Sequence, residues 1–218
     1  MADGKIVKAH GKIQSDSAPF MSTEEAEFLT EMYQKPKVIL EYGSGGSTRI
    51  AAALPNKLIF SVESDLLWAL ELQAELDAAD NLSPATIYPV DIGPVGPWGR
   101  PLSDKHWRVF PRYPCAIWDE PFFRHPDLIL IDGRMRTACF IHAMLRIEKP
   151  VTVLFDDYGV RKLYRQVERL IKPKQIVGTL AHFELTPDSL RKQDMSLAIQ
   201  QFFWGSIHGG TEKFYDRG

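Results

Sequence analysis

Acidic residues follow five short apolar runs of the sequence. They are Glu41, Glu63, Asp91, Asp132 and the pair at 156–157. Carboxylates need water or polar partners, and open parallel sheets bind their ligands at the carboxyl ends of the strands. We therefore expect the runs to be strands whose acidic ends line one ligand site. The alternative is that each carboxylate is only a solvated strand terminus.

A glycine-rich loop follows the first of these runs. In the segment EYGSGGST, Gly43 and Gly45 allow a sharp turn that brings backbone N–H groups against a ligand at the next helix. Glu63 ends the next run, where a carboxylate can accept hydrogen bonds from both hydroxyls of a ribose. The two features predict a nucleoside-containing cofactor. A nucleotide of the NAD(P) type is the alternative, but its fingerprint needs glycine at Thr48, and Glu41 would place a negative charge near a pyrophosphate.

These segments resemble the class I S-adenosylmethionine-dependent methyltransferases over residues 22–205. LEYGSGGST resembles their first motif, SVES the ribose-binding strand end, PVDI the adenine-side acid and LILIDGR the fourth strand, while Ser47 replaces the third motif glycine. The resemblance implies a sheet of order 3-2-1-4-5-7-6 whose last hairpin is antiparallel. It also implies S-adenosylmethionine as cofactor, with these binding residues: Glu41, Gly43, Ser44 and Gly45 for the methionine end, Glu63 and Ser64 for the ribose, and Asp91 for the adenine side.

Asp132 is the predicted catalytic residue. Methyl transfer is an in-line displacement, so the protein chiefly positions a nucleophile, removes its proton and excludes water. At the end of the fourth strand Asp132 can act as the base for a hydroxyl or amine of a small-molecule or sugar-like acceptor. Two alternatives stay open: Asp132 only caps the turn Gly133–Arg134, or the whole chain is a non-catalytic binding module with this fold.

A divalent cation is a second prediction for the same strand ends. Asp132, Asp156 and Asp157 could supply oxygen ligands to magnesium, which is similar to the catechol-type O-methyltransferases, although Met135 replaces their lysine. Solvated or helix-capping aspartates are the alternative. Arg134 and Arg136 follow Asp132 closely, and a guanidinium there could bind a carboxylate or phosphate of the substrate, or neutralise Asp132.

Residues 93–126 interrupt the alternation of strands and helices. This insertion holds seven prolines and seven aromatic residues. Prolines restrict its conformations while Trp107 and Trp118 offer apolar area, which predicts a rigid substrate lid. The alternative is a satellite core cluster under a long loop. His106 and His125 are acid–base candidates only because they lie in the insertion.

The remaining pattern predicts one α/β domain over residues 1–218: a Rossmann-like, doubly wound, seven-stranded sheet in three αβα layers. Residues 1–20 are predicted to be a flexible arm, and Ser22 and Glu25 have the spacing of a capping box. Apolar spacing predicts a buried helix after Asp132 and an amphipathic helix at Val160–Ile171. Two final strands, Gln175–Leu185 and Ser196–Gly205, are expected to form the antiparallel hairpin.

Composition excludes several other classes. Hydrophobic residues make up 44% of the 218 residues and charged residues 25%, which is typical of globular chains. A net charge of -2 predicts no general attraction to nucleic acid or anionic membranes. No apolar run is long enough to span a membrane, and the two cysteines lack metal or disulfide spacing. We expect a cytoplasmic protein with a small-molecule substrate, and leave a homodimer open.

Overall fold

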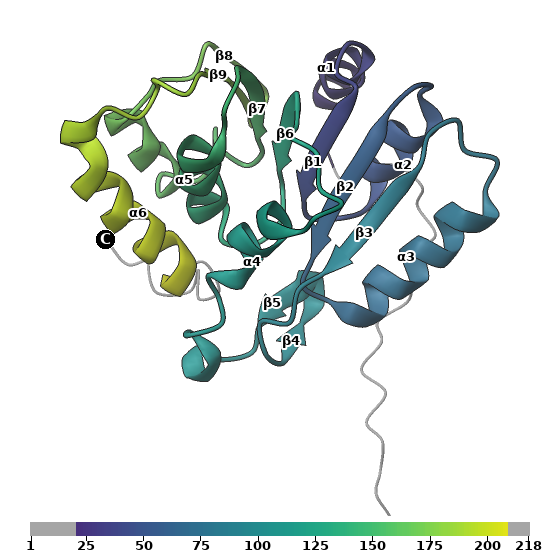
Figure 1. Cartoon of the computed structure of the whole chain (residues 1–218), viewed down its shortest axis with the longest axis horizontal. Helices are drawn as coiled ribbons and strands as arrows, with labels where there is room; N and C mark the ends of the chain where they lie inside the picture. The colour runs from purple at the N-terminus through teal and green to yellow at the C-terminus, as the bar shows by residue number, and fades with distance from the viewer. Residues whose placement is uncertain (1–20, 209–218) are drawn as a thin grey trace, which may run out of the picture.

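The computed structural model describes residues 21–208 and contains one seven-stranded sheet (Figure 1). The strand order is β3-β2-β1-β6-β7-β9-β8, in which the first five strands are parallel while β9 runs antiparallel to β7 and β8. The predicted order and the antiparallel last hairpin are confirmed. The strands are β1 Val38–Tyr42, β2 Leu58–Glu63, β3 Ala85–Pro89, β6 Leu128–Ile131, β7 Val151–Phe155, β8 Gln175–Val177 and β9 Leu180–Leu185.

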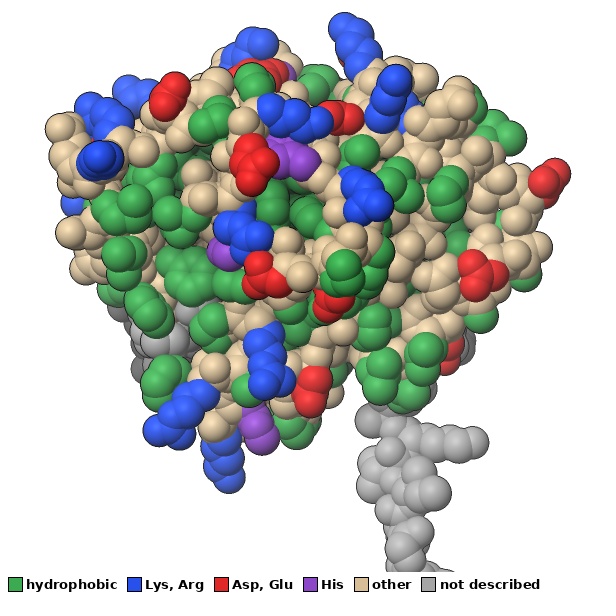
Figure 2. Space-filling view, viewed as in Figure 1, with side chains coloured by type: hydrophobic (Ala, Val, Ile, Leu, Met, Phe, Trp, Pro, Cys, Tyr) green, Lys and Arg blue, Asp and Glu red, His purple; other side chains and the backbone are tan. Residues whose placement is uncertain are grey.

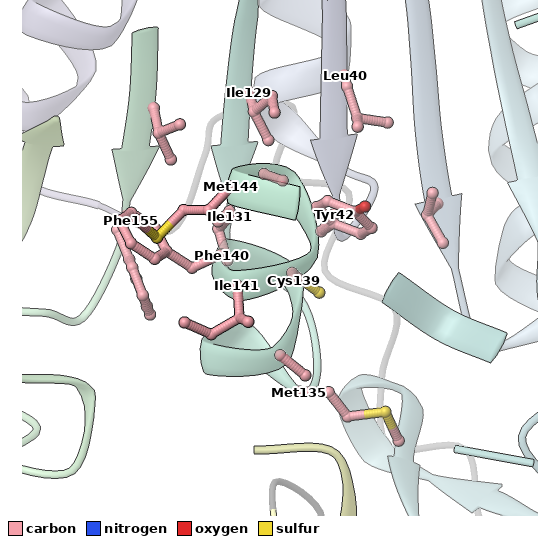
Figure 3. Packing of buried hydrophobic residues seen from close by; sticks show 14 of the residues in the cluster. Leu40, Tyr42, Ile129, Ile131, Met135, Cys139, Phe140, Ile141, Met144 and Phe155 are labelled. Carbon is pink, nitrogen blue, oxygen red and sulfur yellow. The ribbon is translucent and has the colours of Figure 1, made fainter. Parts of the chain in front are cut away.

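Helices cover both faces of the sheet, as expected for right-handed crossovers between parallel strands. On one face lie α1 (Thr23–Gln34), α2 (Gly46–Ala53) and α3 (Leu66–Ala78), and Leu29 and Ala51 pack there against Ile39 and Ile59 of the strands. On the other face α5 (Arg136–Arg146) packs on Leu40, Tyr42 and Ile129, as Figure 3 shows. The result is the predicted three-layer αβα arrangement. The N-terminus of α1 has the predicted capping box, in which Ser22 and Glu25 bond reciprocally.

The insertion is folded into short elements: β4 (Val95–Gly96), β5 (Arg100–Pro101) and α4 (Arg112–Cys115), with 3-10 turns at Pro97–Gly99, Asp104–His106 and Ala116–Asp119. In Figure 1 α4 and the β4–β5 pair lie at one end of the central strands. Phe110, Tyr113, Ile117 and Trp118 are buried in the main core cluster. The insertion is therefore built into the core that underlies the sheet's carboxyl edge.

The predicted helix at Val160–Ile171 is wrong in extent. Only a 3-10 helix at Tyr164–Arg169 forms, and no side chain caps its N-terminus. The ring of Tyr164 packs 5.1 Å from that of Phe155 on β7. Tyr164 and Val167 are both buried, so tertiary packing overrides the helical periodicity of the segment.

The predicted strand at Ser196–Gly205 is also wrong, because these residues belong to the helix α6 (Met195–His208). Both strands of the hairpin come instead from the predicted strand Gln175–Leu185, which turns at Gly178 with φ 58°. A short apolar run does not distinguish a strand from a buried helix. Here Ala198, Gln201 and Gly205 are buried at helical spacing, and a Cβ on Gly205 would lie 2.7 Å from the backbone nitrogen of Ala138 on α5.

Basic and acidic side chains are interspersed over much of the face seen in Figure 2, with hydrophobic side chains between them. None of the helices described between residues 21 and 208 combines the length and apolarity that crossing a membrane requires. The cytoplasmic location and the homodimer stay predictions, and the predicted arm at residues 1–20 lies outside the described residues.

Candidate functional site

The parallel strands bring most of the predicted site residues to one edge of the sheet. Glu41 pairs in register with Ser61 on β2 and Leu130 on β6, and Ile131 pairs with Phe155 on β7. The loops that follow β1, β2, β6 and β7 therefore leave the sheet side by side. The insertion covers part of this edge, where the Tyr113 hydroxyl accepts a 3.4 Å hydrogen bond from the backbone N–H of Arg134.

Glu41 is fully buried below the glycine loop. Its carboxylate accepts hydrogen bonds from the Tyr33 hydroxyl at 2.7 Å and from Thr48 Oγ1 at 2.5 Å. Burial raises the pKa of Glu41, and these hydrogen bonds act against the rise. Glu41 thus joins β1 to α1 and α2 and holds the loop in place from beneath.

The two glycines of the loop differ in their surroundings: Gly43 is closely packed, and Gly45 lies next to open space. Gly43 has φ 99°, and a Cβ there would lie 2.7 Å from the Cα of Gly133, so the turns after β1 and β6 pack backbone against backbone. Around Gly45, by contrast, a Cβ would meet no atom within 4 Å. Ser44 lies between them, and its Oγ is 2.7 Å from Ser61 Oγ. The loop therefore presents its Gly45 side to open space.

Glu63 lies beside this loop and is only 7% exposed. Its Oε1 accepts N–H groups from Ser64 at 2.6 Å and Asp65 at 2.9 Å, and its Oε2 accepts the N–H of Ser44 at 3.3 Å. Burial raises the pKa of Glu63, although these N–H donors oppose it. Ser64 Oγ donates to the carbonyl of Gly99 at 2.9 Å, so the β4–β5 hairpin rests on this strand end.

Asp91 follows Val90, whose backbone N–H bonds to the carbonyl of Glu63 at 2.7 Å. The side chain of Asp91 is exposed and accepts the backbone N–H of Gly93 at 2.8 Å, so it caps the turn that opens the insertion. In the described structure Asp91 makes this local bond and leaves its remaining capacity to solvent.

Asp132, Asp156 and Asp157 meet at the ends of β6 and β7, as the sequence predicts. They surround the guanidinium of Arg136, whose nitrogens lie 2.9 Å from Asp132 Oδ1, 3.2 Å from Asp156 Oδ2 and 3.2 Å from Asp157 Oδ2. Among residues 21–208 no three histidine, cysteine or acidic residues are arranged to hold a metal ion. The magnesium prediction therefore finds no support here, because a side-chain cation fills the centre of the cluster. We name Asp132, Arg136, Asp156 and Asp157 the arginine–aspartate cluster.

Asp132 is the most accessible carboxylate of this cluster, with 37% of its side chain exposed against 12% for Asp156. Partial burial of the Asp132 carboxyl and the charges of the neighbouring carboxylates raise its pKa, while Arg136 opposes the rise. Two non-glycine residues here have positive φ: Met135, which precedes Arg136, at 53°, and Asp157 of the cluster itself at 58°. Such conformations cost energy and tend to occur at functional sites.

Arg134 and the two tryptophans differ in their surroundings. Arg134 Nε is buried and has no hydrogen-bond partner among the described residues. Trp107 is 41% exposed and lies beneath the guanidinium of Arg108, which is 5.1 Å from the ring centroid. Trp118 is 8% exposed and donates its Nε1–H to the Tyr42 hydroxyl at 2.7 Å. Trp107 is therefore accessible to solvent, whereas Trp118 faces the core, and the substrate role of both stays a prediction.

The chain is similar to a methyltransferase-like protein from Silicibacter pomeroyi DSS-3 of known crystal structure. The two are 42% identical, the match covers 86% of this chain and 98% of that one, and the TM-score is 0.79. The chain belongs to the class I S-adenosylmethionine-dependent methyltransferase family. An O-methyltransferase from Bacillus cereus in complex with SAH is 15% identical to the chain with a TM-score of 0.45, over 84% of this chain and 68% of that one. No family model and no curated protein matches the chain.

In this member of the methyltransferase family, three site residues have contacts that the sequence did not predict. The ion pair of Arg136 with Asp132 is one of the two predicted alternatives, but the contacts of Arg136 with Asp156 and Asp157 after β7 were not predicted. Gly99 and Tyr113 reach the site from the insertion, whose internal fold has no periodic signal. Of the two histidine candidates, His125 accepts the backbone N–H of Glu148 at 2.9 Å, and the ring of His106 packs on Gly93.

Proposed function

We propose that the chain is an S-adenosylmethionine-dependent methyltransferase that acts on a small-molecule or sugar-like acceptor. The observation that carries this proposal is the position of Glu63 beside the glycine loop, with Oε2 3.3 Å from the N–H of Ser44. A strand-end carboxylate next to such a loop can bind ribose hydroxyls. The 42% identity to a methyltransferase-like protein supports assigning the loop to this cofactor.

The residues at the loop fit the cofactor. Oε2 of Glu63 accepts one long N–H bond among residues 21–208 and retains capacity for a ribose hydroxyl. The open space beside Gly45 leaves room for the methionine end near Gly43 and Ser44. Glu41 supports the loop without facing that space, since Tyr33 and Thr48 already use its carboxylate. Ser64 and Asp91 extend the proposed site towards the adenine side.

The β4–β5 hairpin covers one side of this proposed site. A Cβ on Gly99 would lie 3.0 Å from Glu63 Oε1, and Gly99 also accepts the hydrogen bond of Ser64. A ribose whose two hydroxyls bond to both oxygens of Glu63 needs the space beside Oε1 that Gly99 occupies. We therefore include in the proposal that the hairpin moves away from Ser64 when the cofactor binds.

When bound, the cofactor supplies an electrophilic methyl group on its sulfonium. Asp132 has an exposed carboxylate at the same sheet edge and takes the proton from the acceptor hydroxyl or amine. Arg134, with its unpartnered Nε, binds an anionic group of the acceptor. Trp107 offers an apolar wall to the acceptor. The chain's contribution is thus orientation and proton removal.

Binding and turnover are tested with two variants. Titration calorimetry with S-adenosylhomocysteine should give micromolar affinity, about -8 kcal/mol, in the wild type. Glu63→Gln should weaken it by about 10- to 100-fold, because a charged hydrogen-bond acceptor is worth about 1.5–3 kcal/mol. Asp132→Asn should keep this affinity but lose turnover in a screen of small hydroxyl- and amine-containing metabolites.

Glu75→Gln is the matched control, since Glu75 forms an ion pair with Arg49 at the surface of α3 and should leave binding unchanged. Equal affinity in Glu63→Gln and wild type would remove the cofactor assignment. Preference for NADH would indicate an oxidoreductase instead. Tight binding without turnover on any acceptor would favour a non-catalytic binding module.

A further inference from the structure

Arg136 lies where the three aspartates would otherwise converge on a metal ion. Oxygen ligands bind magnesium at about 2.0–2.1 Å and calcium at about 2.3–2.6 Å. The three carboxylates instead approach guanidinium nitrogens at 2.9–3.2 Å, which are the distances of charge-assisted hydrogen bonds. The side chain of Arg136 is 5% exposed, so the cation is enclosed within the fold.

The guanidinium is occupied on its other sides as well. Its Nε donates to the carbonyl of Gly133 at 3.0 Å and its Nη1 to the carbonyl of Asp156 at 2.8 Å. Its carbon lies 5.7 Å from the centroid of the Tyr164 ring. With these donors used by the protein, Arg136 is suited to hold other groups in place and is not placed to bind a ligand itself.

The position of Arg136 contradicts the usual preference of helices. It is the first residue of α5, where the helix dipole disfavours a positive charge. It is also buried, which is costly for a charge without partners. The three carboxylates offset both the unfavourable helix dipole and the cost of burying the charge. The strained residues Met135 and Asp157 shape the turns that bring the carboxylates to Arg136. An arrangement that breaks local rules at a strand-end site is expected where function requires it.

We propose that Arg136 is a positioning residue that takes the place of a divalent cation and holds Asp132 at the acceptor side of the site. The cluster then needs no metal ion to keep its three carboxylates together. The proposal has two parts. The catalytic part rests on the proposed function, whereas the metal-binding part concerns the arginine–aspartate cluster alone.

The metal-binding part is tested by adding Mn²⁺ to the full chain and following the free ion by electron paramagnetic resonance. The wild type should bind no Mn²⁺ at the cluster. Arg136→Ala leaves three carboxylates around an emptied space and should gain about one Mn²⁺ per chain. The double variant Arg136→Ala/Asp132→Asn should lose this gain, because it removes one of the three carboxylates.

Arg161→Ala is the matched control. Arg161 also forms an ion pair with Asp157, at 3.0 Å, but from the outer side of the cluster, so its removal should create no Mn²⁺ site. If Arg136→Ala unfolds without metal, recovery of its melting transition by Mn²⁺ supports the proposal equally. A wild-type chain that binds Mn²⁺ through Asp132 would overturn it, as would a folded Arg136→Ala that binds no more Mn²⁺ than Arg161→Ala.

The catalytic part is tested once an acceptor is known. Chelation of divalent ions should leave wild-type turnover unchanged. Arg136→Ala should lower kcat by about 10- to 100-fold, as removal of groups that orient a site does, with the affinity for S-adenosylhomocysteine preserved. Partial recovery of kcat by Mn²⁺ in this variant alone would distinguish positioning from a loss of fold. Loss of wild-type activity on chelation contradicts the metal-free mechanism but leaves the proposed methyl transfer standing.

Discussion

Glu63 and Asp132 differ in how much of their bonding capacity the protein itself uses. Glu63 receives backbone N–H groups on both oxygens and is nearly enclosed, so its position is fixed before any ligand arrives. Asp132 is held on one oxygen by Arg136 and remains 37% exposed. A fixed carboxylate suits recognition of a hydroxyl pair, and an accessible one suits proton transfer.

The strand-end carboxylates could be found from the sequence because each follows an apolar run. The meeting of Asp132, Asp156 and Asp157 was predicted, and an arginine that neutralises Asp132 was one of the alternatives. The contacts of Arg136 with Asp156 and Asp157 were not predicted, because they depend on the left-handed turn at Met135, which has no local sequence signal.

Glu25 gives a prediction about acid stability. Burial would raise its pKa, but hydrogen bonds from Thr179 and Ser22 outweigh that effect and lower the pKa to about 2. Glu25 therefore stabilises the folded state above its ordinary pKa of 4.5, and this contribution is lost as the pH falls from 4.5 towards 2. At pH 7, Glu25→Gln should lower the free energy of unfolding by about 2 kcal/mol.

The measurement is urea denaturation of wild type and Glu25→Gln at several pH values. The difference between the two chains should narrow steadily as the solution is acidified below pH 4.5. Glu24→Gln, an exposed neighbour on α1, provides the control and should show no such trend. A difference that stays constant down to low pH would show that Glu25 acts through packing alone.

At the scale of elements, the insertion contributes to the core, which is one of the two alternatives from the sequence, while its role as a substrate lid stays a prediction. Its α4 and the turn at Ala116–Asp119 contribute to the core cluster, while its β4–β5 hairpin rests on the end of β2. Proline and aromatic content indicated a rigid segment. They could not indicate which aromatic side chains face inward, because the segment has neither the period of a strand nor that of a helix.

The two tryptophans of the insertion should therefore respond differently to truncation. Trp118→Ala removes a buried ring and its bond to Tyr42, and should cost about 3–5 kcal/mol of stability. Trp107→Ala removes a half-exposed ring, and should raise the acceptor KM while the melting temperature changes little. Thermal unfolding and acceptor kinetics on both variants separate the cases. An equal fall in melting temperature would place Trp107 in the core as well.

The errors in the last third of the chain have a common cause. The segments at Val160–Ile171 and Ser196–Gly205 both have apolar side chains at spacings that suit more than one structure. In the structure the first segment packs through Tyr164 on Phe155 of the preceding strand, and the second packs on α5, which is far away in the sequence. Local pattern predicts an element well when its apolar face is its main constraint, and poorly when tertiary contacts decide.

At the scale of the whole molecule, the sheet order was predictable and the covering of its edge was not. Alternating strands and helices with right-handed crossovers predicted an α/β sheet covered on both faces, and the resemblance to the class I methyltransferases predicted the order of its strands. The insertion does not continue the alternation of strands and helices, so its position over the edge of the sheet was not predictable. It decides how much of the carboxyl edge a ligand can reach.

The hydrogen bond between Ser64 and Gly99 implies that opening of the β4–β5 hairpin limits the rate of ligand binding. If the hairpin must leave before a ribose reaches Glu63, association occurs only from the open fraction of molecules. Trp68, whose Nε1 donates to the carbonyl of Ser44 at 2.9 Å, provides a fluorescent probe beside the loop. In stopped-flow mixing, the observed rate should rise with S-adenosylhomocysteine concentration and then level off at the rate of opening. A linear rise of the observed rate at all concentrations would mean that the ligand binds while the hairpin is closed. A plateau means that the opening of the hairpin, and not the ligand concentration, determines the rate of binding.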